Sequence, residues 1–314
     1  MNWPRWRRDD DDAALLGALA TQGAVVVELA PSTAAAAAAA LAVVPAFFAE
    51  PAATKCEVGI EGSRHHRGYS VMQNERDHRE QLHLGRDRPA VPGAVGGARL
   101  QGGNRWPATA GFRPAVERWF DLAEALGWRC VTAVATRFGA AAAAWRGDDP
   151  YTLLKCIGYH PQLDGRSPRR GVAAHVDFSL VTLTLQDDVG GLELQRPDGV
   201  WAAVPPRPGT LLLHAGELLQ YVTGGALQAT PHRVVNPSPA RARVSLPLFV
   251  NPSLDVVLRP PPTAGRVTVV TAATDGPAGH VHRVLPDGPP PSLSFGAAEW
   301  QRKGENRWCA RCCG

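Results

Sequence analysis

The chain has 314 residues, of which 45% are hydrophobic and 20% are charged, and its formal net charge is +4 at pH 7. These values are ordinary for a globular protein with a substantial core, and the length allows one large or two modest domains. No basic run is interleaved with aromatic residues, so nucleic-acid binding is not expected.

Three features of the sequence bear on where the protein works. A secretory signal has an apolar stretch directly after its positive charges, but an acidic run, Asp9 to Asp12, stands in that place. No window of about 18 apolar residues is free of proline and charge, so neither a membrane span nor a membrane partner is expected. The six cysteines are not spaced as a disulfide framework, which indicates a reduced, cytoplasmic protein. Three of them form a terminal CxxC cluster without a second pair, for which we expect reactive thiols rather than a zinc site: Cys309, Cys312 and Cys313.

The first 50 residues predict two helices and a strand. Residues 13–30 combine a short apolar helical pattern with the β-branched run AVVVEL after Gly23. The alanine-rich stretch that follows is expected to form a helix capped by Ser32 or Thr33, and Pro45 is expected to end or kink it.

The remaining chain divides into loop, helix and strand regions. Residues 51–107 are rich in Gly, Arg and His and are expected to form a long loop. Apolar residues recur at helical spacing over 109–145. Short apolar runs separated by Pro and Gly over 153–252 predict the many strands of a sandwich or barrel, and little periodicity follows residue 255.

A candidate metal site begins in the segment AAHVDF. His175 and Asp177 are two residues apart on a predicted strand, so their side chains point to the same side. His232, in ATPHRVVNPS, lies at the start of another predicted strand. Two histidines and one carboxylate bind one side of a metal and leave the other open, which points to non-haem Fe(II) oxygenases. A structural zinc site would fill its fourth position with protein, and no nearby cysteine does so.

A candidate anion clamp follows the second histidine. Arg243 and Ser245 lie two residues apart in RVSLPLF and would share one face of a strand. A guanidinium with a neighbouring hydroxyl suits a carboxylate, so a ligand that bridges the clamp and an open metal site is expected. A dicarboxylic keto acid has this form.

These segments together resemble a known family. HVDFSLVTLTLQDDVGGLELQ, WAAVPPRPGTLLLHAGELLQYVTGG, ATPHRVVNPS and RVSLPLFVNPSLD follow the motif order of the isopenicillin N synthase-like family of 2-oxoglutarate/Fe(II)-dependent oxygenases. Weaker likeness lies in RGYSVM, EQLHLG and GGNRWP, so the resemblance covers most of the chain. It implies a mainly β fold with flanking helices around a double-stranded β-helix (jelly-roll) core. It also implies Fe(II) ligation and catalysis by His175, Asp177 and His232, and binding of 2-oxoglutarate by Arg243 and Ser245.

The resemblance also implies a domain organisation and an activity. We expect one oxygenase domain over 1–314, with a mostly helical or loop region at 1–148, the jelly-roll core at 149–255 and a C-terminal segment at 256–314. The enzyme would use O2 to hydroxylate, desaturate or cyclise a small molecule such as an amino acid, small peptide or specialised metabolite, releasing succinate and CO2. Because Asp177 is retained, halogenation is disfavoured. Two alternatives stay open: an Fe(II)/O2 oxidase that does not use 2-oxoglutarate, and a non-catalytic jelly-roll binding protein.

The chain departs from the family pattern at two places. A tyrosine that contacts the co-substrate often precedes the proline upstream of HxD, but IGYHP has His160 there, with Tyr159 expected on the opposite face. Either His160 is the co-substrate contact, or this contact is lost in the chain. HAGE at 214–217 replaces the usual Asn-x-Gly-Asp, which brings His214 near the site as a candidate substrate contact.

A further set of candidate substrate contacts comes from SRHHRGY. A loop with two arginines and a tyrosine could meet a polar or anionic substrate. The residues are Arg64, Arg67 and Tyr69.

Overall fold

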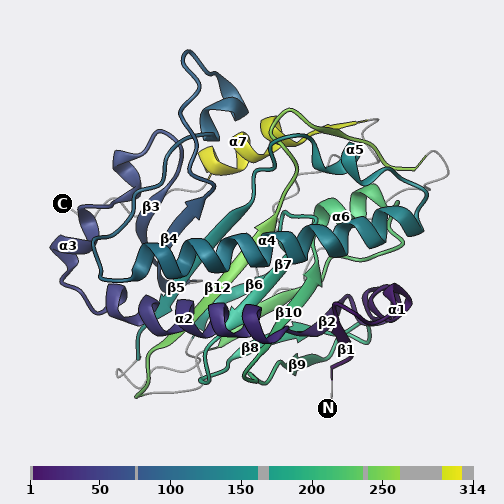
Figure 1. The fold of residues 1–314 in the computed structure, drawn as a ribbon, viewed down its shortest axis with the longest axis horizontal. Coiled ribbons are helices and arrows are strands. Elements are labelled where there is room, and N and C mark those ends of the chain that lie inside the picture. The colour runs from purple at the N-terminus through teal and green to yellow at the C-terminus, as the bar shows by residue number, and fades with distance from the viewer. Residues whose placement is uncertain (1–2, 75–76, 162–169, 236–239, 262–291, 306–314) are drawn as a thin grey trace.

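The structure is a computed structural model, shown as a ribbon in Figure 1. It describes residues 3–74, 77–161, 170–235, 240–261 and 292–305. The C-terminal cysteine cluster lies outside these residues.

Strands are the main secondary structure in the described second half of the chain. Their bounds are β1 Arg5–Arg7, β2 Ala24–Glu28, β3 Gly68–Gln73, β4 His78–Gly85, β5 Leu153–Tyr159, β6 Arg170–His175, β7 Val181–Gln186, β8 Leu192–Gln195, β9 Trp201–Ala203, β10 Thr210–Ala215, β11 His232–Val235, β12 Arg243–Val250, β13 Val257–Leu258 and β14 Leu293–Ser294.

Helices occupy much of the first half and the described C-terminal part. Their bounds are α1 Asp12–Gln22, α2 Pro31–Phe48, α3 Ala52–Cys56, α4 Phe112–Arg137, α5 Ala142–Arg146, α6 Glu217–Val222 and α7 Phe295–Glu305, with short 3-10 helices η1 Ile60–Gly62 and η2 Gly96–Leu100.

Two sheets form the core. The larger has eight strands in the order β1-β2-β10-β7-β12-β5-β4-β3, and the smaller has four in the order β6-β11-β8-β9. Neighbouring strands are antiparallel except for β1 and β2. Antiparallel sheets with non-consecutive neighbours form a jelly roll, so the predicted mainly β fold with flanking helices is confirmed.

Helices α2 and α4 cover the outer face of the large sheet (Figure 1). Both pack on β12, with α2 also on β5 and α4 on β7. The predicted apolar stripe of α4 is buried from Phe112 to Phe120. Because the helices shield this face, the opposite face of the sheet is free to line a cavity toward β6 and β11.

Helix α2 differs from the sequence expectation in two ways. Its N-cap is Ala30, with no side-chain cap, and Pro45 lies inside a helix that continues to Phe48. Pro45 is near the last turn, so its missing N–H costs a single backbone hydrogen bond and does not end the helix. By length and composition α2 could also cross a membrane, but Val44, Phe47 and Phe48 are buried in the protein core. The buried share of this helix is 33%, and the helix contacts α4, β12 and β5.

The expected long loop over 51–107 contains paired strands. β3 pairs with β4, and β4 pairs in register with β5, from Glu80 opposite Gly158 to Gly85 opposite Leu153. The prediction of a loop over 51–107 is therefore wrong at β3 and β4. Tertiary pairing on the edge of the sheet overrides a weak local pattern.

The described cysteines differ from the sequence expectation at one residue. Cys130 and Cys156 are buried free thiols, whereas Cys56 is disulfide-bonded, so the expectation of a fully reduced chain is wrong at that residue.

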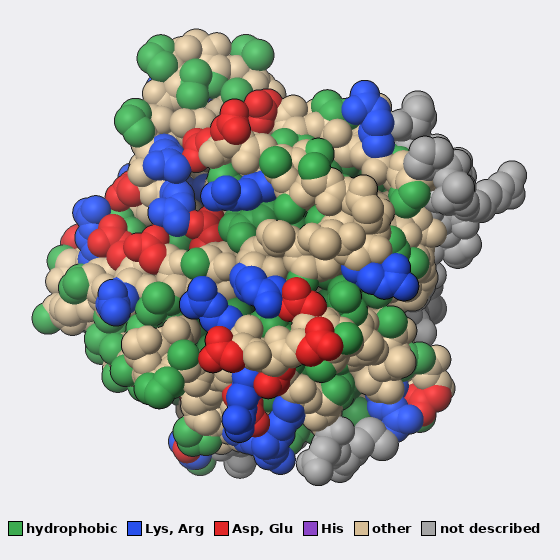
Figure 2. All heavy atoms as spheres, turned by 45° about the vertical axis from the view of Figure 1, so that its right-hand side comes forward, with side chains coloured by type: hydrophobic (Ala, Val, Ile, Leu, Met, Phe, Trp, Pro, Cys, Tyr) green, Lys and Arg blue, Asp and Glu red, His purple; other side chains and the backbone are tan. Residues whose placement is uncertain are grey.

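Basic and acidic side chains are interspersed on the face shown in Figure 2. On α4, Arg113 and Glu117 form an exposed ion pair at 3.0 Å.

Candidate active site

The predicted metal ligands converge at one end of the small sheet. One potential ligand atom from each of His175, Asp177 and His232 lies within 4.8 Å of the other two. His175 ends β6 and His232 begins β11, and the two residues are directly opposite each other in the antiparallel ladder. Asp177 follows two residues after β6 and turns its carboxylate toward both rings.

Backbone carbonyls orient both imidazoles. Nδ1 of His175 lies 2.9 Å from the carbonyl oxygen of Ala173, and Nδ1 of His232 lies 3.0 Å from that of Thr230. When the Nδ1–H of an imidazole donates to a carbonyl, Nε2 carries the free electron pair that can bind a metal. The two Nε2 atoms lie 3.5 and 3.6 Å from Oδ1 of Asp177, so the three ligand atoms face a common point.

The far side of the Asp177 carboxylate is held by β7 and β10. Thr182 Oγ1 donates to Oδ2 at 2.7 Å, and Nε2 of His214 lies 3.6 Å from the same oxygen. Ser179 Oγ lies 3.0 Å from Thr182 Oγ1, which extends the network. These contacts fix the carboxylate while its Oδ1 stays directed to the histidines.

Burial sets the protonation of the ligands. Burial lowers the pKa of His232 to about 3, so this imidazole is neutral at neutral pH, the form that binds a metal. Burial alone would raise the pKa of Asp177, but His232, His175 and His214 around it outweigh that effect and hold the pKa well below its usual range. The carboxylate is therefore ionised.

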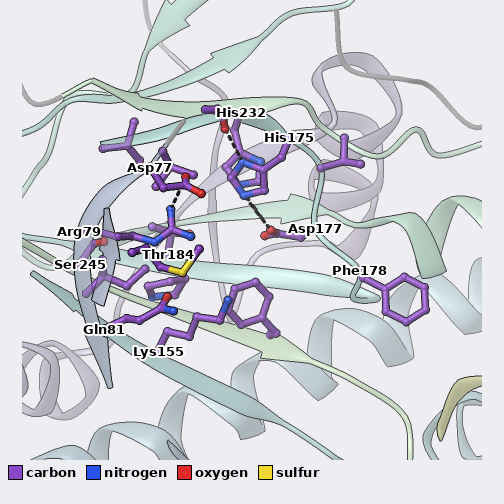
Figure 3. Close-up of a pocket in the computed structure, with 18 of the residues that line it drawn as sticks. Asp77, Arg79, Gln81, Lys155, His175, Asp177, Phe178, Thr184, His232 and Ser245 are labelled. Atoms are coloured by element: carbon purple, nitrogen blue, oxygen red, sulfur yellow. Dashed lines mark hydrogen bonds and ion pairs between the residues drawn. The ribbon is translucent and has the colours of Figure 1, made fainter. Parts of the chain in front are cut away.

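A cavity of about 620 Å³ opens beside these residues, between the two sheets (Figure 3). Its lining includes His175, Asp177 and His232 from the side of the small sheet and inward-facing residues of β4, β5, β7 and β12 from the large sheet. Helix α7 adds its residues Glu299, Arg302 and Lys303. The volume falls in the range of small-molecule sites.

Arg243 and Ser245 line the same cavity from β12, as predicted from their spacing. Arg243 is fully buried, donates to the carbonyl of Gly190, and reaches Ser245 Oγ at 3.2 Å and Gln186 Oε1 at 3.3 Å. A guanidinium has five N–H donors, so these three bonds leave two for a ligand.

Tyr159 is on the cavity wall, and His160 is not. The guanidinium carbon of Arg243 lies 4.7 Å from the Tyr159 ring centroid. His160 Nε2 instead pairs with Glu80 at 2.9 Å, and its side chain is partly exposed outside the cavity lining. The expected orientation of the two residues is therefore reversed, and His160 is replaced by Tyr159 as the candidate co-substrate contact.

Four predicted substrate contacts do not reach the cavity. Arg64 is exposed, and Arg67 is buried against Tyr151, to whose hydroxyl it donates at 2.7 Å. Tyr69 packs edge-on against Phe47 in the hydrophobic core, because alternation on β3 turns it to the helix-covered face. His214, on β10, is fully buried behind Asp177, where it can support the carboxylate but cannot meet a substrate.

Several residues of the cavity lining were not predicted from the sequence. They are polar side chains at alternate positions of strands whose other face is apolar, and this period of two was the available signal. The set consists of Arg79, Gln81, Lys155 and Thr184.

The residues present fit the metal and the co-substrate. Two imidazole nitrogens and one carboxylate oxygen on one side of a point, with a cavity on the other, match the ligand set of non-haem iron, which consists of two histidines and a carboxylate. The buried Arg243 with two free donors suits the distal carboxylate of a dicarboxylic acid.

Comparisons with known proteins agree with this chemistry. The sequence profile of the 2OG-Fe(II) oxygenase superfamily matches residues 149–252, and that of the non-haem dioxygenase in morphine synthesis N-terminal region matches residues 7–109. Homoarginine-6-hydroxylase 2-ODD-233 of Oryza sativa subsp. japonica is 32% identical over 231 residues, which cover 69% of this chain and 70% of that protein. The 2-oxoglutarate-dependent dioxygenase citB of Monascus ruber is 29% identical over 239 residues, covering 70% of this chain and 71% of that protein.

Solved structures share the fold. A 2OG-Fe(II) oxygenase family protein from Caulobacter crescentus superposes with a TM-score of 0.75 at 27% identity, covering 96% of this chain and 98% of that one. A full-length Neurospora crassa protein in complex with alpha-KG and 5-formyluracil gives a TM-score of 0.72 at 24% identity, covering 94% of this chain and 90% of that one. The chain belongs to the 2OG-Fe(II) oxygenase superfamily and is an Fe(II)- and 2-oxoglutarate-dependent dioxygenase.

Proposed function

We propose that His175, Asp177 and His232 are the iron ligands and that Arg243 and Ser245 hold the distal carboxylate of 2-oxoglutarate. The observation that carries this proposal is the convergence of the three ligand atoms within 4.8 Å, with both histidines oriented by backbone carbonyls. Second-sphere contacts of this kind fix the tautomer and the direction of a metal-binding imidazole. The cavity beside the triad then holds the co-substrate and the substrate together.

Bound iron, with O2 and 2-oxoglutarate, supplies the oxidising chemistry, and the co-substrate leaves as succinate and CO2. The residues of the chain position the co-substrate and the substrate. Arg243, backed by Tyr159, sets one end of the co-substrate, while the buried walls of the cavity keep bulk water from the reacting groups. Asp177 occupies the third ligand position, so hydroxylation of a C–H bond is the favoured outcome, with desaturation and cyclisation as variants of the same oxidation.

The substrate class is a small polar molecule, with amino acids as the first candidates. The cavity lining carries several charged and amide side chains besides the triad, which is unusual for a purely apolar substrate. The rice relative is named a homoarginine-6-hydroxylase, which makes L-homoarginine the first substrate to test. We further place the enzyme in the isopenicillin N synthase-like group and in specialised metabolism, on the sequence arguments given above. We also place it in the cytoplasm, with which the free thiols of Cys130 and Cys156 agree.

A two-step experiment tests this function. Anaerobic addition of Fe(II) and 2-oxoglutarate should produce a weak visible charge-transfer band, and addition of O2 with candidate amino acids should release succinate. Oxidation of a substrate at full rate without 2-oxoglutarate would instead identify an Fe(II)/O2 oxidase. Absence of both metal uptake and the band would contradict the assignment of the triad.

A further inference from the structure

Lys155 is a cavity residue whose charge has no partner among the described residues. It lies on β5 and lines the cavity, and Figure 3 shows its side chain on the wall that also carries Arg79 and Gln81. Among the residues that the structure describes, none accepts a hydrogen bond from its ammonium group or forms an ion pair with it. Its one contact of note is with the ring of Phe249, whose centroid lies 4.9 Å from Nζ.

Three other cations of the cavity lining are paired with carboxylates. Arg79 pairs with Asp77 at 3.0 Å, and Lys303 and Arg302 on α7 lie 3.4 and 3.6 Å from the carboxylate of Glu299. Among the described lining residues, this leaves two cations without a carboxylate within ion-pair distance, Lys155 and Arg243. Arg243 is assigned to the co-substrate, so Lys155 is the second position for an anion.

The strand register separates these two positions. Arg243 is opposite Tyr159 and Ser245 is opposite Ile157, while Lys155 lies two residues further along the same face of β5. At about 3.3 Å per residue, Lys155 and Tyr159 are about 13 Å apart along the strand. One carboxylate cannot bridge that distance, so Lys155 and Arg243 cannot serve the same end of one small ligand.

Gln81 offers a second unpaired group beside Lys155. On β4, Gln81 is opposite Ile157, and His83 is opposite Lys155, which makes Gln81 a diagonal neighbour of Lys155 on the same face. Its amide nitrogen donates to Ser70 Oγ at 3.2 Å. Its Oε1 is buried and has no hydrogen-bond partner among the described residues. A donor and an acceptor, both unpaired, therefore face the cavity side by side.

A buried polar atom without a partner, such as Gln81 Oε1, is costly and is kept where a ligand pairs with it, and the half-buried side chain of Lys155 lines the same cavity. Burial, with the nearby cations Lys303 and Arg79, lowers the pKa of Lys155 to about 7, which agrees with an ammonium that lacks a counter-ion. A single free positive charge suits a monoanion such as a carboxylate better than a phosphate dianion.

We propose that Lys155 binds a carboxylate of the substrate and that Gln81 Oε1 accepts a hydrogen bond from an N–H or O–H group adjacent to that carboxylate. The substrate is then a small acid with a neighbouring donor, of which an α-amino acid is the simplest form. Its carboxylate is anchored on β5, so the opposite end of the molecule is presented to the iron site on the small sheet. This inference rests on the proposed function, because it assigns the space beyond the co-substrate to the substrate.

The test uses the Fe(II)–2-oxoglutarate enzyme under anaerobic conditions and pairs of probes that differ in one group. Each pair is an amino acid and its primary amide, beginning with L-homoarginine, L-arginine and L-lysine, and the readout is the melting temperature at millimolar probe. At least one acid is expected to raise the melting temperature of the wild-type enzyme more than its amide does. Lys155→Met should abolish that difference, and the KM of any acid that is turned over should rise tenfold or more.

Two further variants make the result decisive. Lys155→Arg keeps the charge and should keep the preference for the acid over its amide. Lys303→Met is the matched control, because Lys303 is already paired with Glu299, and it should also keep this preference. The charge-transfer band must survive in Lys155→Met. Loss of the band in wild type would defeat the proposed function, whereas loss in Lys155→Met alone would show that Lys155 serves the co-substrate and overturn this inference. An intact band with no acid preferred over its amide in the wild-type enzyme would also overturn it.

Discussion

His175 and His232 are directly opposite each other on antiparallel strands β6 and β11, and their ring centroids lie 4.2 Å apart. Cross-strand neighbours of this kind are held by the ladder itself, so the two nitrogens are positioned before any metal arrives. Asp177 completes the set from the adjacent loop. We expect Asp177→Ala and His232→Ala each to abolish iron binding and turnover while the fold is retained, as measured by metal content, succinate release and circular dichroism.

The control for these variants is a histidine outside the cavity. His78, the first residue of β4, is half-buried and is not part of the cavity lining. His78→Ala should keep stoichiometric iron. Wild-type turnover in Asp177→Ala or His232→Ala would contradict the ligand assignment.

The co-substrate clamp gives a second prediction. Arg243→Met removes the buried charge that faces the distal carboxylate, and truncation of one partner of a buried charge pair costs several kcal/mol, so the KM for 2-oxoglutarate should rise about 100-fold or more. Ser245→Ala loses one hydrogen bond from the Arg243 guanidinium, worth about 1.5 kcal/mol, which corresponds to about tenfold. Steady-state kinetics at saturating iron measure both, and equal effects of the two changes would argue against a clamp centred on Arg243.

The reversed orientation of Tyr159 and His160 is testable in the same assay. Tyr159→Leu removes the ring beneath Arg243 and should raise the KM for 2-oxoglutarate about fivefold. His160→Ala should leave that KM unchanged, because His160 pairs with Glu80 outside the cavity and Glu80 keeps its 2.7 Å ion pair with Lys55. The opposite ranking would restore His160 as the co-substrate contact.

Support of the Asp177 carboxylate by Thr182 predicts an effect on iron affinity. Thr182→Val keeps the shape and removes the 2.7 Å hydrogen bond to Oδ2, so the affinity for Fe(II) should fall about 10- to 100-fold, with turnover largely recovered at high iron. Thr184, two residues along the same strand, lines the cavity and is not bonded to the carboxylate. Thr184→Val is therefore the matched control, and an equal loss of affinity in it would remove Thr182 from the metal site.

The acidity of Lys155 predicts how substrate binding depends on pH. Its pKa in the protein without substrate is about 7, so the charged form dominates below pH 7 and is lost above it. If Lys155 binds a carboxylate, the KM of an acid substrate should rise toward tenfold per pH unit above about pH 7, and Lys155→Met should lack this rise. A flat profile in the wild-type enzyme would count against charge pairing at this residue. The charged or titratable groups that face Lys155 are Arg79 and His83 on β4, Asp177 after β6, and Arg302 and Lys303 on α7.

The iron ligands and the clamp could be found from the sequence because strand geometry makes them local. His175 with Asp177 and Arg243 with Ser245 are each two residues apart, and a period of two places such pairs on one face wherever the strand lies. The α4 stripe was found for the same reason at helical period. The sequence could not show that β3 and β4 join the large sheet, because strand pairing depends on contacts with β5, about 70 residues away along the chain.

The sequence by itself determined the residue types of the site, the order of the motifs and the jelly-roll class. Only the tertiary structure decided which polar side chains share the cavity. It turned Tyr159 inward and His160 outward, buried Tyr69 in the core and moved His214 behind Asp177. It also placed Lys155 beside Gln81 Oε1, neither of which has a hydrogen-bond partner among the described residues. The physical reason is that one residue of register decides the face of a strand, and register is fixed by the neighbouring strands rather than by the local sequence.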